Sequence, residues 1–265
     1  MIEYAFERIE TDAGDTADLA TITLRNAAVR NAVDEEALRA LDAAYRRAEA
    51  DGARAVLLQG EGRAFCAGRD ISRVDPRTDD VPGYLDGLLA PLLRRIADFP
   101  APTFAAAQGA CLGVGLGLLI ATDVVYVADD AKIGSPFGAL GAALDSGGHA
   151  FFLERLGAHR TLDLVYTGRL LTGAEAVAGG LFSRSMSPDE LAPRTREAAI
   201  AAASGPTAAF VASKRLLWRL RTERLGFWDA LDAESSVQAT LSTTEDYREG
   251  FAAFQQRRAP VFRGR

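Results

Sequence analysis

Asp145 is the residue of this chain whose setting best suits chemistry. It lies in the run LGAALDSGGH at residues 140–149, and a glycine-rich run, GACLGVGLG, precedes it at residues 109–117. Glycines that enter a helix leave backbone N–H groups free, and the N-terminus of a helix favours negative charge. The two runs therefore predict a site where a carboxylate works beside backbone donors. The number of carboxylates decides which proton transfers such a site can perform.

The glycine-rich run has three possible uses. Its glycines fall at 113, 115 and 117, which departs from the G-x-G-x-x-G order of a dinucleotide-binding loop. An oxyanion hole is the second use, with one N–H from this run and one from the segment RAFCAGRDI at residues 63–71. Close helix packing is the third, and the segment at 63–71 could itself be an ordinary strand-to-helix turn. At this level the alternatives stay open.

Composition limits the class of protein. The 265 residues are 48% hydrophobic and carry a net charge of −6, which predicts one domain with a C-terminal extension and does not favour nucleic-acid binding. The two cysteines, Cys66 and Cys111, stand in apolar surroundings, which indicates a reduced protein of the cytoplasm rather than a disulfide framework. We expect no metal site, no signal peptide at the acidic N-terminus and no membrane span, because the apolar stretch at 111–121 is too short.

Strands and helices alternate along most of the chain. A hairpin is predicted from residues 2–9 and 17–24 around a polar turn at 11–15, and Asp34 is expected to cap a helix that buries Leu38, Leu41 and Ala44. The further predicted elements are strands at 55–60, 103–108 and 124–127, helices at 85–98 (with a possible kink at Pro91) and 113–121, and C-terminal helices at 208–221, 227–241 and 247–256. This order predicts an α/β layered domain without strands after about residue 186. The loop at 73–83 is predicted to be mobile or an active-site lid.

Several segments together resemble one family. The runs at 63–71 and 109–117, LLTGAEA at 170–176, GGLF at 179–182 and the ending DYREGFAAF at 246–254 are similar to the enoyl-CoA hydratase/isomerase (crotonase) superfamily, from about residue 5 to the C-terminus. Within it, an aspartate followed by x-Gly-Gly at 145–148 most resembles the 1,2-epoxyphenylacetyl-CoA isomerase and Δ3–Δ2-enoyl-CoA isomerase group. The resemblance implies an α/β crotonase-like ββα spiral at 1–190 and a helical region at 191–265 for CoA closure and assembly as a homotrimer or homohexamer.

The resemblance also implies roles for particular residues. The backbone N–H groups of Cys66 and Val114 would form the oxyanion hole, each contributing about 3 kcal/mol of transition-state stabilisation. Many members have glycine where this chain has Val114. The residues implied to bind the CoA part of the substrate are Arg30, Ala64, Ala67, Asp70, Ile71, Phe254 and Arg257. Phe254 and Arg257 would act in a neighbouring subunit's site, although a merely solvated basic tail is an equal alternative. No separate cofactor is implied.

The departures from the family decide the expected reaction. Hydratases of this family use two glutamates, which would fall at Gly117 and Phe137, and neither residue here can ionise. Hydration needs one group to activate water and another to protonate the α-carbon. A single carboxylate still permits a proton shuttle, in which Asp145 takes a proton from C2 of a 3-enoyl thioester and returns it to C4. An apolar wall of Phe137, Leu140 and Leu144 would raise the pKa of Asp145.

Other interpretations of Asp145 compete with the shuttle. It could cap a helix at 147–156. In related aryl-CoA dehalogenases an aspartate here is a nucleophile helped by a histidine, but Arg94 stands about where that histidine would be. His149 could face the pocket, and a hydrolase triad of neighbouring residues is disfavoured. We therefore expect an isomerase. The alternatives are a hydratase whose second group is water or His149, and a non-catalytic acyl-CoA-binding or assembly subunit.

Overall fold

A six-stranded sheet forms the centre of the protein. The computed structural model describes the chain apart from residues 11–13 and 15. The strand order is β1-β2-β3-β4-β6-β9, with β1 and β2 antiparallel and every later pairing parallel. The strands span Ile2–Glu10, Thr16–Leu24, Ala55–Gly60, Thr103–Ala107, Val124–Ala128 and Arg184–Met186. The predicted hairpin and the three predicted central strands are confirmed, while most of the predicted turn at 11–15 lies outside the described residues.

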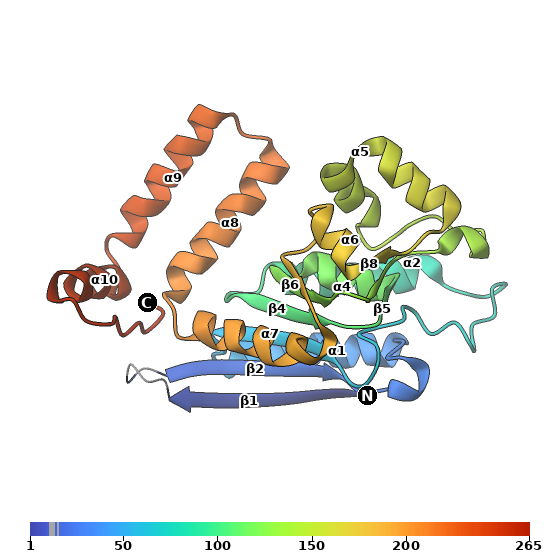
Figure 1. Cartoon of the computed structure of the whole chain (residues 1–265), viewed down its shortest axis with the longest axis horizontal. Coiled ribbons are helices and arrows are strands. Elements are labelled where there is room, and N and C mark those ends of the chain that lie inside the picture. The colour runs from blue at the N-terminus through green and yellow to red at the C-terminus, as the bar shows by residue number, and fades with distance from the viewer. Residues whose placement is uncertain (11–13, 15) are drawn as a thin grey trace.

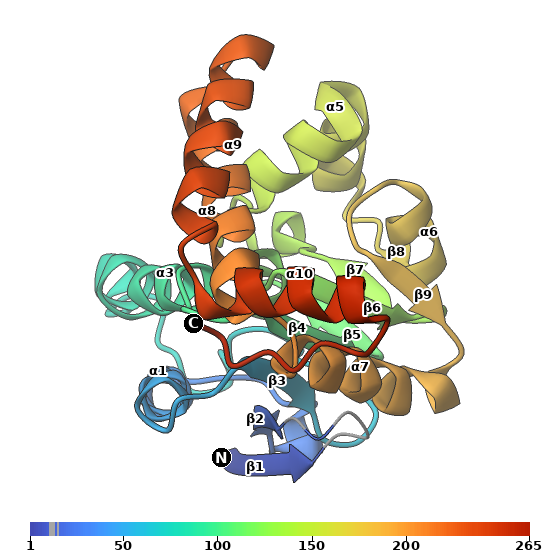
Figure 2. The same ribbon diagram turned by 90° about the vertical axis from the view of Figure 1, so that its left-hand side faces the viewer.

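Helices cover both faces of this sheet (Figures 1 and 2). The connections between the parallel strands carry α1 (Glu35–Ala50), α2 and α3 (Val81–Tyr84 and Ala90–Ala97) and α4 (Val114–Ala121). Right-handed crossovers that advance in one direction place their helices on the same face. After β9 the chain returns as α7 (Pro188–Ala203), which packs across β2, β3, β4 and β6 from the other side. The α/β layered fold is therefore confirmed.

Local sequence accounts for several of these boundaries. Asp34 caps α1 by accepting a hydrogen bond from the Ala37 N–H at 2.8 Å, and Leu38, Leu41 and Ala44 are buried as predicted. The predicted helix at 85–98 is a π-helical turn, Leu85–Leu89, followed by α3. Pro91 directly follows that π-helical turn inside one continuous helical run, where proline lacks the N–H that would pair with a carbonyl of the preceding turn.

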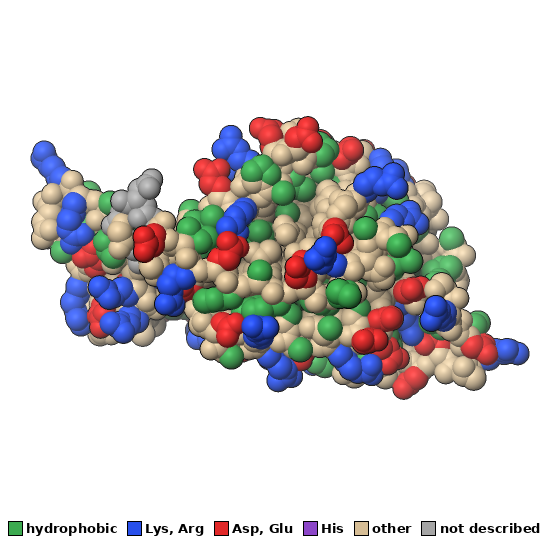
Figure 3. All heavy atoms as spheres, turned by 90° about the horizontal axis from the view of Figure 1, so that it is seen from below, with side chains coloured by type: hydrophobic (Ala, Val, Ile, Leu, Met, Phe, Trp, Pro, Cys, Tyr) green, Lys and Arg blue, Asp and Glu red, His purple; other side chains and the backbone are tan. Residues whose placement is uncertain are grey.

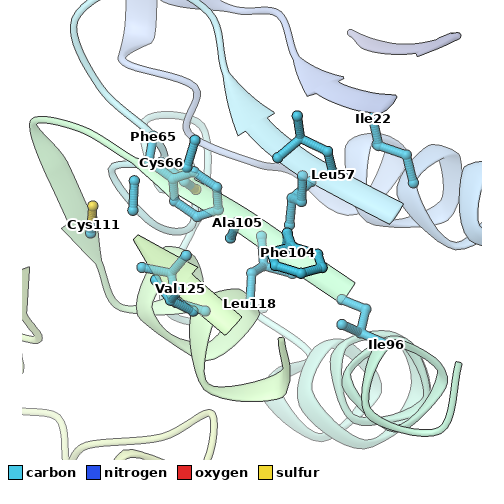
Figure 4. Packing of buried hydrophobic residues seen from close by; sticks show 14 of the residues in the cluster. Ile22, Leu57, Phe65, Cys66, Ile96, Phe104, Ala105, Cys111, Leu118 and Val125 are labelled. Atoms are coloured by element: carbon cyan, nitrogen blue, oxygen red, sulfur yellow. The ribbon is translucent and has the colours of Figure 1, made fainter. Parts of the chain in front are cut away.

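The hydrophobic core occupies both faces of the sheet. By the strand register, Ile22 and Val125 point to one face, and Leu57 and Phe104 point to the other. Figure 4 shows them in one cluster with Ile96 of α3 and Leu118 of α4, and Phe104 also lies beside Glu190 and Arg194 of α7. Phe65 and Cys66 enter the same cluster from the segment after β3, so the segment at 63–71 is anchored by its own apolar side chains. This burial fixes the position of the backbone that follows Cys66.

A second, small sheet was not predicted from the sequence. It consists of β5 (Ala110–Leu112), β7 (Lys132–Gly134) and β8 (Leu171–Thr172). Strands of two or three residues are too short to show a hydrophobic period. Because β5 lies inside the glycine-rich run, that run does not pass directly into a helix: it makes a strand first, and α4 begins after Gly113.

The division of the chain at residue 190 stays a prediction. The first C-terminal helix, α7, packs against the sheet, and its Leu191, Ala199 and Ala203 belong to the core. Beyond it, α8 (Thr207–Glu223) and α9 (Phe227–Leu241) form a projecting hairpin, and α10 (Glu245–Gln256) lies at its base (Figure 1). The three predicted C-terminal helices are confirmed, and β9 is the last strand of the described chain.

The surface shows no broad field of one charge on the face drawn in Figure 3, where acidic and basic side chains are interspersed. Within the described residues, no helix has the length and apolar character needed to cross a membrane. The element that follows the predicted catalytic run is α5 (Gly148–Thr167), which breaks at Gly157. Together with α6 (Gly173–Ala178) it lies beside α2 and α4 at the end of the molecule remote from α10 (Figure 1).

Candidate active site

The first turn of α4 presents a free backbone donor. Gly113 precedes the helix with φ of 51°, a conformation that favours glycine, and Val114 is the first helical residue. The N–H of a first helical residue has no intrahelical acceptor. No acceptor for the Val114 N–H occurs among the described residues outside the helix either. Val114 is therefore available as an oxyanion donor, as the resemblance implies.

The predicted second donor, Cys66, is not available. Its N–H donates to the carbonyl oxygen of Ala110 at 2.9 Å, and its own carbonyl accepts from the Leu112 N–H at 3.0 Å. These bonds join Cys66 to Cys111 in a parallel bridge, so the backbone at Cys66 continues the small sheet. The assignment of Cys66 as an oxyanion donor is wrong, because its N–H is already held by a buried carbonyl.

Arg69 supplies a free N–H instead. On either side of it the backbone is paired, since the Gly68 carbonyl accepts from Val33 and the Asp70 N–H donates to Val33, both at 2.9 Å. In the described part of the chain the Arg69 N–H has no acceptor. The preceding residue, Gly68, approaches Gly113 so closely that an added Cβ would lie 3.9 Å from the Gly113 Cα. The free N–H groups of Arg69 and Val114 thus follow two adjoining glycines.

Asp145 precedes the start of α5 and is half-buried. Its carboxylate accepts a hydrogen bond from the Ser146 hydroxyl at 2.6 Å. Burial raises the pKa of Asp145 above its ordinary value, while the Ser146 hydrogen bond and the charge of Arg69 lower it in part. The N-cap of α5 is Gly147, with no side-chain cap. The interpretation of Asp145 as a helix cap is therefore wrong, because its carboxylate caps no helix.

The two positions expected for glutamates both adjoin this site. An added Cβ at Gly117 would lie 2.5 Å from the Ser146 Cβ, and one at Gly113 would lie 3.0 Å from the Phe137 ring.

The apolar wall predicted beside Asp145 is present only in part. Leu144 is buried and Phe137 half-buried, but Leu140 is 62% exposed and does not desolvate Asp145. His149 is also exposed, so in the single chain it faces no closed pocket.

The Arg69 side chain organises the loop beside the site. Its guanidinium makes two hydrogen bonds to Asp79, at 2.8 and 2.7 Å, and lies 3.9 Å from the centre of the Tyr84 ring. Tyr84 is buried, which raises the pKa of its phenol. The loop at 73–83 is thereby tied to the residue that offers the oxyanion donor. Its role as a lid stays a prediction.

Most of the residues implied for CoA binding come together. The Ala67 N–H donates to the Arg30 carbonyl at 2.9 Å, and Asp70 pairs with Val33 in the same pair of segments. Ala64 is buried, and its carbonyl accepts from the amide of Asn31 at 2.7 Å. Ile71 is half exposed next to them. Phe254 and Arg257 lie at the end of α10, on the opposite side of the molecule from α2 and α5 (Figure 1). Within one chain they do not reach the site.

Four residues of the site were not singled out from the sequence: Arg69, Asp79, Tyr84 and Ser146. An arginine in a turn and an aspartate in a polar loop give no local signal of pairing ten residues apart. Ser146 was weighed only as part of a hydrolase triad. The free N–H of Arg69 could have been suspected, because Gly68 is followed directly by it and glycine marks close backbone approach. Arg94, which stands about where the helper histidine of the dehalogenases would be, is exposed on α3.

The fold and this arrangement define an acyl-CoA enzyme class, and comparisons with known proteins give the same family. The enoyl-CoA hydratase/isomerase family model matches residues 14–265, and the chain belongs to that family. It is similar to the "Probable enoyl-CoA hydratase" of Rhodobacter capsulatus, at 34% identity over 93% of this chain and 95% of that one. It is also similar to the 1,2-epoxyphenylacetyl-CoA isomerase of Escherichia coli, at 30% identity over the whole of both chains.

A solved structure shares the fold. The enoyl-CoA hydratase from Bacillus anthracis superposes with a TM-score of 0.86, covering 99% of both chains at 24% identity. The crotonase-like fold predicted from the sequence is therefore confirmed. At this identity the likeness concerns the fold alone, and the relatives carry names of both hydratases and an isomerase.

Proposed function

We propose that this enzyme is an acyl-CoA isomerase that shifts a double bond in a CoA thioester by a proton shuttle on Asp145. The observation that carries the proposal is a single candidate base: Asp145 is a half-buried carboxylate that feels the charge of Arg69, and its neighbour Ser146 lies against Gly117 of α4. The two positions expected for glutamates hold Gly117 and Phe137. The carboxylate of Asp79 is already paired with Arg69, which leaves Asp145 as the candidate base. One such base suits the transfer of one proton between two carbons of the same substrate.

The steps follow from the residues. The thioester oxygen accepts hydrogen bonds from the N–H groups of Arg69 and Val114. Asp145 removes a proton from C2 of a 3-enoyl thioester, and the electron pair of the C–H bond moves toward the thioester, giving a dienolate whose oxygen the two donors stabilise. Asp145 then delivers the same proton to C4, and the double bond ends between C2 and C3. Each donor contributes about 3 kcal/mol of transition-state stabilisation.

The raised pKa of Asp145 suits this role. A carboxylate whose pKa is raised by burial is a stronger base than an exposed one, and it can accept the C2 proton and give it back. The Ser146 hydrogen bond and the charge of Arg69 act in the opposite direction and lower the pKa of Asp145 in part. Ring expansion of an epoxyphenylacetyl thioester is the second candidate reaction, and the E. coli relative with that name favours it.

The substrate is an acyl-CoA thioester, and we propose that the CoA adenine is held between subunits of a trimer or a dimer of trimers. The aromatic residues Phe227 and Trp228 of α9 are each 74% exposed, and Trp218 of α8 and Phe254 of α10 are exposed too. Apolar surface of this extent on a projecting hairpin calls for a partner surface. A second copy of the chain supplies one in the proposed assembly.

A substrate screen with one variant tests the function. Purified enzyme is given 3-enoyl-CoA, 2-enoyl-CoA and epoxyphenylacetyl-CoA thioesters, and Asp145→Asn serves as the isosteric control. Conversion of 3-enoyl to 2-enoyl thioester, lost in Asp145→Asn by a factor of about 100 to 10,000, is the expected result. Rapid hydration of the 2-enoyl thioester would assign the enzyme to the hydratases. Binding without turnover of any thioester would make it a non-catalytic acyl-CoA-binding subunit.

A further inference from the structure

Ser146 has an unusual backbone and an unusual neighbour. Its φ is 56°, in the left-handed region that residues with a Cβ rarely adopt. Its hydroxyl donates to Oδ1 of Asp145 at 2.6 Å. A Cβ added to Gly117 would lie 2.5 Å from the Ser146 Cβ, 3.1 Å from its Oγ and 3.4 Å from its carbonyl oxygen. The Ser146 side chain therefore lies against α4 where any side chain at position 117 would begin.

We propose that Ser146 is a positioning residue for Asp145 and that its side chain occupies the space a second carboxylate would need at position 117. The proposal rests on the proposed function, because it concerns how the same carboxylate is held for proton transfer. It adds a cause for the absence of the second acid. Position 117 cannot gain a side chain while Ser146 stays in place, so the site is built for one base.

Two physical arguments support a role beyond the turn itself. First, a left-handed residue immediately before Gly147, which also has positive φ, would be less strained as glycine. The serine therefore needs a compensating interaction, and the only side-chain bond that it makes among the described residues is to Asp145. Second, hydrogen bonding to an ionised carboxylate favours its charged form, and Ser146 lowers the pKa that burial raises. The bond thus fixes both the orientation and the charge of Asp145.

A pair of substitutions separates this role from a backbone role. Ser146→Ala removes the hydroxyl and keeps the Cβ with its strain, whereas Ser146→Gly removes the hydroxyl and relieves the strain. If the hydroxyl positions Asp145, both variants lower kcat for 3-enoyl-CoA isomerisation, by up to about 100-fold. Both also move the acid limb of the kcat profile to higher pH, because the ionised carboxylate loses a donor. KM for the thioester changes little.

The packing half of the proposal has its own test in a double-mutant cycle. Gly117→Ala is expected to lower kcat, because the new Cβ displaces Ser146. Glycine-to-alanine changes inside helices normally stabilise, so this loss cannot come from helix propensity. Adding Ser146→Gly removes the clashing Cβ, and the double variant should then match Ser146→Gly alone. Gly87→Ala is the control, since Gly87 is an exposed helical residue with no atom within 4 Å of an added Cβ.

The outcomes are distinguishable. If Ser146→Ala and Ser146→Gly keep the wild-type pH profile and kcat while Asp145→Asn is inactive, the positioning role is overturned and the proposed function stands. If Gly117→Ala is as active as Gly87→Ala, the packing claim is overturned. If Asp145→Asn isomerises the 3-enoyl thioester at the wild-type rate, the proposed function itself fails, whatever the Ser146 variants do.

Discussion

Arg69 and Asp79 form a two-bond ion pair that closes the loop after the segment at 63–71 against the candidate site. Both side chains are largely shielded, with exposures of 20% and 14%. The pair matters because the Arg69 N–H is a candidate oxyanion donor and because the guanidinium also stacks on Tyr84. Holding the side chain therefore holds the backbone donor as well.

We predict that Asp79→Asn lowers kcat/KM several-fold by loosening Arg69, since small displacements of a catalytic donor are costly. The matched control is Asp75→Asn. Asp75 pairs with Arg77 in the same loop, but that pair is well exposed and exposed pairs contribute little. Steady-state kinetics on both variants provides the measurement. Equal kcat/KM for the two variants would show that the Arg69–Asp79 pair does not position the site.

We predict that the carboxylate of Asp145 lowers the free energy of unfolding of the protein. Burial raises its pKa in the folded state above the unfolded value, so its contribution to stability is present below the unfolded pKa and is lost as pH rises through the folded pKa. At neutral pH the ionised carboxylate therefore costs free energy, and Asp145→Asn should unfold at higher urea concentration than the wild type. The difference should shrink as pH falls to about 4. A variant that is less stable at pH 7 would contradict the raised pKa.

The Val114 donor can be removed without removing the helix. Proline is tolerated in the first turn of a helix, where its missing N–H would be unpaired. Val114→Pro is therefore expected to fold and to lose kcat by about 100- to 1,000-fold, the typical effect of one oxyanion donor. Val114→Ala retains the N–H and should keep kcat within a few-fold, with a modest loss of stability from the smaller buried side chain. Similar kcat values for the two variants would remove Val114 from the oxyanion hole.

Long helices and strands, and the candidate base Asp145, could be predicted from the sequence. Hydrogen bonds and contacts between residues far apart in the chain could not. The helix capped by Asp34 and the three central strands follow from local spacing, and Asp145 was found from its surroundings. Cys66 was misassigned because only the fold shows that its N–H donates to Ala110, 44 positions along the chain. Gly68 gave the one local hint to Arg69, but only the fold shows that no acceptor among the described residues takes the Arg69 N–H.

The same reason explains two other features that the sequence did not show. α7 is a helix like those that follow it, and only its packing across the sheet shows that it contributes to the core. Gly117 was recognised as a missing glutamate, but the sequence could not show that Ser146 fills the space beside it. Long-range contacts of this kind depend on how β5, α4 and the start of α5 meet, and two of these elements are too short or too uniformly apolar to place by periodicity.

Phe254 gives the sharpest test of assembly, because it is 84% exposed on α10, and α10 lies on the opposite side of the molecule from α5, which follows Asp145 (Figure 1). If Phe254 and Arg257 complete a neighbouring subunit's site, Phe254→Asp should raise KM for the thioester strongly while leaving its own Asp145 intact. Asp145→Asn should be inactive because it lacks the base, although its Phe254 is intact. Unfolding and refolding the two variants together should restore activity, since some sites then combine Asp145 of one chain with Phe254 of another. Light scattering on the mixture confirms that it has the wild-type mass. A mixture of correct mass with no more activity than its parts would show that Phe254 does not act across a subunit boundary.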